Sequence, residues 1–273
     1  MILFNPVHVI WKTSFFTIYS WGLMFIIAFI IAGLLFYLEA RKKGVSQDSV
    51  LKILLLILIG AIVGGRLFFV FENLSMFLAK PLEILAYGQG GETSYGGIIL
   101  AVLFVWLYLR KNKEIKFSQV LDMSAPYLAL GLAIARIGCF LNWCCYGITS
   151  TLPWGIQVAG DVVRHPTQLY ELIYCLVIFG LLMWFKGIRE KKSKNLDLSG
   201  IKGNISLRHV SWFDKILAKR GALFLIFLIL YSILRFFNDF LRIYSINWLG
   251  LALSQWLLII VFVVSGIILI KKK

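Results

Sequence analysis

The sequence predicts an all-α, polytopic membrane protein. Hydrophobic residues make up 60% of its 273 residues, charged residues only 15%, and the mean hydropathy is +0.86. A soluble domain carries about 25% charged and about 45–50% apolar residues. The apolar residues of this chain form long runs, and most of the basic residues lie between those runs. This composition excludes a soluble enzyme.

The apolar runs predict about seven transmembrane helices within a single integral membrane domain over residues 1–273. A bilayer core about 30 Å thick needs roughly 20 mostly apolar residues in a helix. The expected spans are 14–37, 51–71, 96–109, 118–140, 166–185, 222–241 and 254–270. Because only Lys12 precedes the first span and no small-residue cleavage site follows it, we expect a retained helix and not a signal peptide.

The distribution of Lys and Arg predicts the orientation. Basic residues concentrate in every second gap, in segments 39–52, 110–116, 186–220 and 271–273. The positive-inside rule then places the N-terminus outside and the C-terminus in the cytoplasm. Residues 186–221 are the expected cytoplasmic loop, in contact with anionic headgroups. This confinement of positive charge to topology signals argues against a nucleic-acid partner.

The other basic residues all fall on the expected outer side, where the same rule disfavours them. They are Lys12, Arg66, Lys80, Arg136, Arg164, Arg235 and Arg242. Four of these arginines lie within or at the edge of apolar spans. An ionisable residue inside a membrane is costly and indicates a functional site.

Residues 135–147 run from a span into an outer loop. Arg136 is expected at the outer end of its helix, Gly138 at a close approach of a neighbouring helix, and Gly147 at a turn. If Arg136 is considered without its neighbours, the alternative to a functional role is an arginine whose side chain only extends to the membrane interface.

Residues 164–171, with the sequence RHPTQLYE, predict a helix that begins at the outer surface. Proline is favoured in the first turn of a helix, and the free N–H groups there attract an anion. Thr167, Gln168 and Glu171 are spaced to form one polar strip.

A third polar set is expected along a single helix, on one stripe: Tyr231, Arg235, Asn238, Asp239 and Arg242. The set holds one more arginine than carboxylate. An unmatched arginine in an apolar span favours a bound phosphate.

Glycines and cysteines give weaker signals. The glycine pairs at 64–65 and 96–97 are typical of helix packing or turns. Cys139, Cys144 and Cys145 lack a paired CxxC spacing, so packing or an outer-face disulfide is favoured over a metal site. Cys175 is expected in the core. No metal and no cofactor is expected.

Several of these motifs resemble the prolipoprotein diacylglyceryl transferase family. The similar segments are 21–24, 136–147, 164–171, 231–242 and 253–255, and the resemblance covers nearly the whole chain except 187–220. It implies a multi-pass enzyme of the bacterial inner membrane. Such an enzyme moves the diacylglyceryl group of phosphatidylglycerol to the lipobox cysteine thiol of a preprolipoprotein, at its signal peptide, and releases glycerol phosphate.

The resemblance also implies roles for individual residues. The expected catalytic residues are Tyr95, Arg136, His165 and Arg235. The expected substrate-binding residues are Arg66, Gly147, Arg164, Gln168, Glu171, Asp239 and Arg242. Arg136 and Arg235 would hold the lipid phosphate.

The chain departs from the family pattern at several positions. Tyr95 replaces a histidine often proposed as the base, Trp21 replaces a tyrosine, Cys139 replaces an asparagine and Asp239 replaces a glutamate. Cys144 and Cys145 lie where a glutamate is usual. Either Tyr95 or His165 is a possible proton acceptor.

Three other classes of function compete with the transferase. A lipid-binding or transferase paralogue with a different acceptor is the main alternative. A transporter needs polar groups on both sides of the membrane, whereas the unusual polar groups here converge on one side. A structural membrane subunit would have no use for arginines within its spans.

Overall fold

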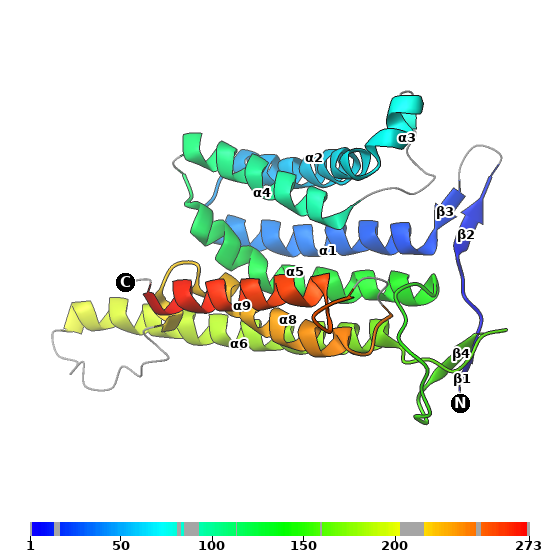
Figure 1. Ribbon diagram of the computed structural model, residues 1–273. Helices are drawn as coiled ribbons and strands as arrows, with labels where there is room; N and C mark the ends of the chain where they lie inside the picture. Colours follow the sequence, from blue (N-terminus) through cyan, green and yellow to red (C-terminus); the bar gives the residue numbers. More distant parts are fainter. Residues whose placement is uncertain are drawn as a thin grey trace. The chain divides into compact units, whose positions relative to one another are not determined.

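The computed structural model describes residues 2–13, 17–80, 83–84, 93–112, 114–158, 160–202, 216–243 and 247–271. Long helices dominate it (Figure 1), which confirms the all-α class. The helices are α1 Ser20–Lys42, α2 Gln47–Glu72, α3 Leu74–Ala79, α4 Ser94–Lys111, α5 Phe117–Leu141, α6 Thr167–Lys202, α8 Ala222–Asp239 and α9 Leu253–Lys271.

Short strands accompany the helices and were not predicted. They are β1 Ile2–Phe4, β2 Val9–Lys12, β3 Thr17–Tyr19, β4 Ile156–Val158, β5 Asn247–Trp248 and β6 Leu251–Ala252. β1 pairs with β4 in parallel, with Leu3 opposite Gln157. β2 pairs with β3, and β5 with β6, both antiparallel.

Six helices among the described residues are long and apolar enough to cross a membrane. They are α1, α2, α5, α6 up to Lys191, α8 and α9. This confirms a polytopic membrane protein. α4 lies at the third expected span and is not one of these six. The orientation of the chain stays a prediction.

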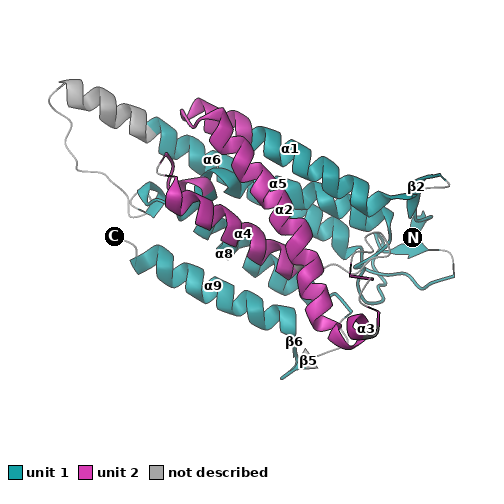
Figure 2. Ribbon diagram, turned by 90° about the horizontal axis from the view of Figure 1, so that it is seen from above, with its two compact units in different colours: residues 1–36, 121–273 teal, residues 37–120 magenta. Residues whose placement is uncertain are grey.

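Backbone contacts divide the chain into two compact units (Figure 2). Unit 1 comprises residues 1–36 and 121–273, and unit 2 comprises residues 37–120. α1 and α5 each contribute to both units. The expectation of a single membrane domain stays a prediction.

In unit 2, glycines let α2 and α4 pack closely. A Cβ atom added at Gly60 would lie 2.5 Å from Cα of Ala101, and one added at Gly64 would meet the carbonyl oxygen of Gly96. Only glycine fits such an approach, which is typical of helix pairs in membranes. The interpretation of these glycines as packing devices is confirmed.

In unit 1, the helices α5, α6, α8 and α9 lie side by side (Figure 1), and they share an apolar core. The core includes Ala125 and Ala129 of α5, Ile178 and Leu182 of α6, Leu223 and Phe227 of α8, and Leu269 of α9. The first helix packs on α5 at Gly138, where an added Cβ would lie 2.8 Å from Cβ of Met24. This is the close approach expected at Gly138.

A buried carboxylate fixes the start of α8. Asp122 of α5 is 5% exposed and accepts hydrogen bonds from the backbone N–H groups of Gly221, at 2.8 Å, and Phe224, at 3.3 Å. Arg189 of α6 pairs with the same carboxylate at 2.7 Å. The first N–H groups of a helix lack partners within the helix. Asp122 satisfies two of them and ties together α5, α6 and α8.

Some span boundaries differ from the expected ones. α1 begins at Ser20 and not at residue 14, because Thr17–Tyr19 pairs with Val9–Lys12 as a strand. α6 continues to Lys202, beyond the expected end at 185, through a segment rich in Lys, Arg and Glu, which favour helix. It therefore covers the first part of the expected loop 186–221, of which residues 203–215 lie outside the described residues.

The packing of α2 on α4 yields a stability prediction. Gly64→Ala should destabilise the protein by about 1–3 kcal/mol, because the new methyl group meets the backbone of α4. Gly180→Ala on α6 is the matched control. Nothing lies within 4 Å of a Cβ added at Gly180, so its helix should gain about 0.5–1 kcal/mol. Thermal unfolding in detergent measures both, and equal Tm values would contradict the close packing.

Candidate functional site

The buried carboxylate of Glu171 joins three helices of unit 1. This side chain of α6 is 1% exposed. Its Oε1 lies 2.8 Å from Nη2 of Arg136 on α5, and its Oε2 pairs with Nη1 of Arg235 on α8. The Tyr231 hydroxyl donates to Oε1 at 2.9 Å. We call Arg136, Arg235 and Glu171 the arginine clamp.

A second carboxylate supports the arginine clamp. Asp239 is 2% exposed, and its Oδ1 lies 3.0 Å from Nε of Arg235, one helical turn away. Its Oδ2 accepts a hydrogen bond from the Ser254 hydroxyl at 2.8 Å. Arg235 is therefore held between two buried carboxylates, which fixes the direction of its guanidinium group.

The geometry of the arginine clamp suits an oxyanion. The two guanidinium groups contact different oxygens of the Glu171 carboxylate. Each guanidinium group stays charged and carries five N–H donors. The contacts described for Arg136 are to Glu171 and, at 3.5 Å, to Sγ of Cys139. These contacts leave further N–H donors for an anion. The prediction that Arg136 and Arg235 belong to one site is supported by their shared partner.

The polar strip at the start of α6 divides between two roles. Glu171 joins the arginine clamp, whereas the Thr167 hydroxyl and the Gln168 amide each donate at 2.6 Å, to the carbonyl oxygens of Cys145 and Cys144. Thr167 and Gln168 therefore hold the loop that carries the cysteines. Within the described residues, neither the amide oxygen of Gln168 nor that of Asn238 has a hydrogen-bond partner.

Gly147 lies where the loop, the start of α6 and the end of α8 meet. Its N–H donates to the His165 carbonyl at 2.9 Å, and it forms an isolated β-bridge with Arg242. A Cβ added here would meet the Leu241 carbonyl oxygen and would lie 2.9 Å from Cγ2 of Thr167. Gly147 therefore permits the backbone contacts that close the loop over α6.

Arg242 corrects one sequence prediction. The expected stripe placed it on one helix with Arg235 and Asp239, but α8 ends at Asp239. The chain leaves the helix because the Leu241 carbonyl accepts from the N–H of Ile148, across the loop. The other members of the stripe are on α8 as expected, and the Asn238 amide donates to the Thr167 carbonyl at 3.3 Å.

Arg164 belongs to the loop. Its Nε and Nη2 contact the carboxylate of Asp161 at 2.7 and 2.9 Å, and its guanidinium carbon lies 4.9 Å from the ring centroid of Tyr146. The Arg164 hydrogen bonds, with one from the Val162 N–H, hold the pKa of Asp161 below its ordinary value. A substrate-binding role for Arg164 stays a prediction.

His165 is oriented by two aromatic residues. Its Nδ1 lies 3.2 Å from the Tyr170 hydroxyl, which accepts a hydrogen bond at 2.9 Å from the indole N–H of Trp154. His165 and Tyr170 therefore share one hydrogen bond, whose donor depends on the tautomer of the imidazole ring.

Two further site predictions fall in unit 2. Arg66 is 6% exposed and donates to the backbone carbonyls of Glu83 and, at 2.9 Å, Ile84. Its guanidinium carbon lies 5.4 Å from the ring centroid of Phe77. Tyr95 lies in the first turn of α4 and is 60% exposed. The substrate-binding role expected for Arg66 and the catalytic role expected for Tyr95 stay predictions.

The cysteines cluster in a way that their spacing did not predict. The sulfur atoms of Cys139, Cys144 and Cys145 all lie within 4.8 Å of one another, and all three thiols are free. Cys139 is 7% exposed, at the end of α5, and the other two lie in the loop that follows. Cys175 is fully buried, which confirms its place in the core.

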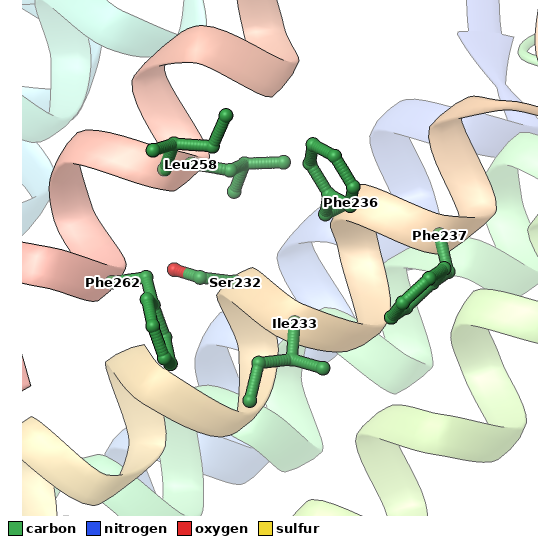
Figure 3. A pocket seen from close by; sticks show the side chains of 7 residues that line it. Ser232, Ile233, Phe236, Phe237, Leu258 and Phe262 are labelled. Carbon is green, nitrogen blue, oxygen red and sulfur yellow. The ribbon is translucent and has the colours of Figure 1, made fainter.

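An apolar groove borders α8 and α9 (Figure 3). Its volume is about 140 Å³, and it is lined by Ser232, Ile233, Phe236, Phe237, Leu258, Ile259 and Phe262. Arg235 lies within the same turns of α8. One helix therefore carries both a clamp arginine and the wall of an apolar groove.

Comparison with known proteins gives a consistent match. The family model described as prolipoprotein diacylglyceryl transferase matches residues 8–271. Three bacterial relatives bear the name phosphatidylglycerol–prolipoprotein diacylglyceryl transferase. The Geobacter sulfurreducens protein is 37% identical over 63% of this chain and 67% of its own length. The Finegoldia magna protein is 34% identical over 84% of this chain and 81% of its own length. The Coxiella burnetii protein is 30% identical over 82% of this chain and 77% of its own length.

The central place of Glu171 yields a second prediction. Glu171→Gln keeps the shape of the side chain but leaves two buried guanidinium groups without their shared anion. It should destabilise the protein by about 3–5 kcal/mol. Asp161→Asn, which removes the carboxylate of the partly exposed pair with Arg164 in the loop, should leave Tm nearly unchanged. Thermal unfolding of both variants tests this, and a Glu171→Gln variant as stable as Asp161→Asn would refute the role of Glu171.

Proposed function

This chain belongs to the prolipoprotein diacylglyceryl transferase family, and we propose that its arginine clamp holds the phosphate of phosphatidylglycerol during transfer. The chain is a multi-pass enzyme of the bacterial inner membrane that acts on phosphatidylglycerol and a prolipoprotein. The acceptor is the lipobox cysteine next to the signal peptide of that prolipoprotein.

The observation that carries this proposal is the pairing of Arg136 and Arg235 on Glu171. Glu171 and Asp239 balance the charge of the two guanidinium groups, but the contacts described for Arg136 leave it further N–H donors. A lipid phosphate has oxygens spaced for such fork-like N–H donors. The remaining donors of Arg136 thus suit the one anionic group of phosphatidylglycerol.

The reaction places a specific demand on the arginine clamp. The acceptor sulfur attacks the glyceryl carbon that carries the phosphate, so a C–S bond forms and the C–O bond breaks. The bonding electrons leave on the phosphate oxygen of glycerol phosphate. Preoriented arginines in a low-dielectric site stabilise this growing negative charge. Their positions are set before substrate binds, because Glu171 and Asp239 already hold them.

The rest of the lipid finds matching surfaces near the arginine clamp. The partnerless amide oxygens of Gln168 and Asn238 are buried acceptors, which favour hydroxyl donors such as those of the glycerol headgroup. The groove between α8 and α9 is apolar and suits an acyl chain (Figure 3). We assign the headgroup to the amides and one acyl chain to this groove.

The acceptor thiol must lose its proton before it attacks, because the thiolate is the nucleophile. His165 and Tyr95 are the two proton acceptors that the sequence offers in place of the family's usual histidine. His165 lies in unit 1, six residues before Glu171 of the arginine clamp, and its carbonyl accepts the Gly147 N–H. We propose His165 as the base because of this link to Glu171.

The test of this function is a turnover assay in detergent. Purified protein receives phosphatidylglycerol with a labelled glycerol headgroup and a lipobox peptide with either cysteine or serine at the acceptor position. We expect release of glycerol phosphate with the cysteine peptide only. Release with both peptides would indicate another acceptor, and lipid binding without release would indicate a lipid-binding paralogue.

The arginine clamp gives a quantitative prediction. Arg136→Ala and Arg235→Ala should each lower kcat by about 10²–10³, the effect of removing one donor to a transition-state anion. Arg235→Lys should recover only part of the loss, since lysine lacks the planar fork. Arg110→Ala, at the end of α4 beside Trp106, is the control and should keep full activity. Full activity in both clamp variants would rule out the phosphate role.

A further inference from the structure

Three free thiols meet at the edge of the arginine clamp. Cys139 ends α5, while Cys144 and Cys145 follow a turn whose backbone is held by Thr167 and Gln168. Their sulfur atoms lie within 4.8 Å of one another. The fold thus holds the carbonyls of both loop cysteines on α6, so the cluster is positioned by described hydrogen bonds and not only by proximity in sequence.

The spacing suits a thiophilic metal ion. A tetrahedral zinc ion with Zn–S bonds of about 2.3 Å separates its sulfur ligands by about 3.8 Å. Small side-chain rotations bring three sulfur atoms within 4.8 Å to that spacing. A disulfide would join two sulfur atoms at about 2.05 Å and would leave the third thiol unused. The three-thiol arrangement therefore favours a metal over a disulfide.

The cluster also touches the site of the reaction. Nη1 of Arg136 lies 3.5 Å from Sγ of Cys139, while Nη2 of the same guanidinium contacts Glu171. Three thiolates around one Zn²⁺ carry a net negative charge, and this neighbouring cation balances it. One guanidinium group therefore separates the cysteines from the proposed phosphate position.

We propose that Cys139, Cys144 and Cys145 bind one zinc ion, whose fourth position takes the acceptor thiol. This inference rests on the proposed function, since it names how the acceptor is activated. Catalytic zinc sites have three protein ligands and one open position. A thiol that coordinates zinc is deprotonated, which supplies the thiolate that the transfer needs.

The step balances without any change of oxidation state. The acceptor thiol releases its proton to a base or to water on binding zinc. Its sulfur forms the C–S bond to the glyceryl carbon as the C–O bond breaks, and the electron pair leaves on the phosphate of glycerol phosphate. The thioether product is a weaker zinc ligand than the thiolate, so it leaves the fourth position open for the next acceptor.

Metal content is the first test, and it does not depend on activity. Full-length protein is purified in detergent without chelators, with Zn²⁺ supplied, and its bound zinc is measured by mass spectrometry. We expect about one zinc per chain, and its loss in Cys139→Ser, Cys144→Ser and Cys145→Ser. Cys175→Ala is the matched control, because this cysteine lies in the core, and it should keep its zinc. Equal zinc in all variants, or none in the wild type, would overturn the proposal.

Cobalt gives a test that needs no variant. Co²⁺ in place of Zn²⁺ should produce the intense near-ultraviolet sulfur-to-metal absorption of thiolate ligation in the wild-type protein. Addition of the lipobox cysteine peptide should change the visible bands of the ion, whereas the serine peptide should not. An unchanged spectrum with the cysteine peptide would overturn the role of the fourth position. The metal site itself would be overturned if protein purified without reductant bound no metal and had lost two free thiols to a disulfide.

Turnover then separates this inference from the proposed function. Removing zinc with a chelator should lower cysteine-dependent release of glycerol phosphate by about 10² or more, the scale of losing assisted proton removal. Added Zn²⁺ should restore it. Full turnover by the metal-free protein would overturn the zinc role and leave the transferase function intact. Absence of turnover in the zinc-loaded wild type would instead count against the proposed function.

Discussion

The desolvated carboxylate of Glu171 is the interaction on which the rest of the structure depends. A lone carboxylate in an apolar bundle is strongly unfavourable, and a well-matched set of partners is needed to offset its desolvation. Arg136, Arg235 and Tyr231 supply that set from α5 and α8. Asp122 acts similarly nearer the opposite ends of the same helices. At 1.5 Å per residue, the residues at the two carboxylate sites are about 21 Å apart on α5, from Asp122 to Arg136, and about 27 Å apart on α6, from Glu171 to Arg189. Three helices are thus joined by polar contacts at two levels, with an apolar core between them.

This arrangement explains how a membrane protein keeps arginines ready for an anion. Arg136 and Arg235 would be expensive to bury alone, and their carboxylate partners make burial tolerable. The same partners prevent the guanidinium groups from turning toward the interface. Fixed donors of this kind need little rearrangement when charge develops in a reaction. Stability and readiness therefore come from the same ion pairs.

The sequence predicted the positions of the helices better than the contacts between them. Long apolar runs are set by local composition, so the long helices lie close to the expected spans. The cost of burying Arg136 and Arg235 is also a local property, so the sequence singles out both, and the structure shows that they share Glu171 as a partner. The partnership of Glu171 with both arginines depends on how α5, α6 and α8 pack, which no spacing within one helix reveals. Arg242 was misplaced because a contact from the loop, at Ile148, ends α8 earlier than its hydrophobicity suggests.

The cysteine cluster and the strands were missed for a related reason. Cys139 and Cys145 come together because the loop folds back onto Thr167 and Gln168. The usual metal motifs encode their geometry in short fixed spacings, and this loop does not. The strands are two to four residues long, and tertiary pairing decides such short segments more than their own propensity does.

The pairing of β1 with β4 bears on how the chain threads the bilayer. β1 precedes α1, and β4 follows α5, yet the two strands share hydrogen bonds and so lie on the same face of the membrane. The chain must therefore cross an even number of times between them. α1, α2 and α5 account for three crossings, so among the described helices parity assigns the fourth crossing to α4, the third span expected from the sequence. The described helices then agree with the seven spans expected from the sequence, and the placement of the two ends of the chain in different compartments stays a prediction. The three-residue strand β1 thus constrains whether α4 crosses the membrane, although the two elements are not paired.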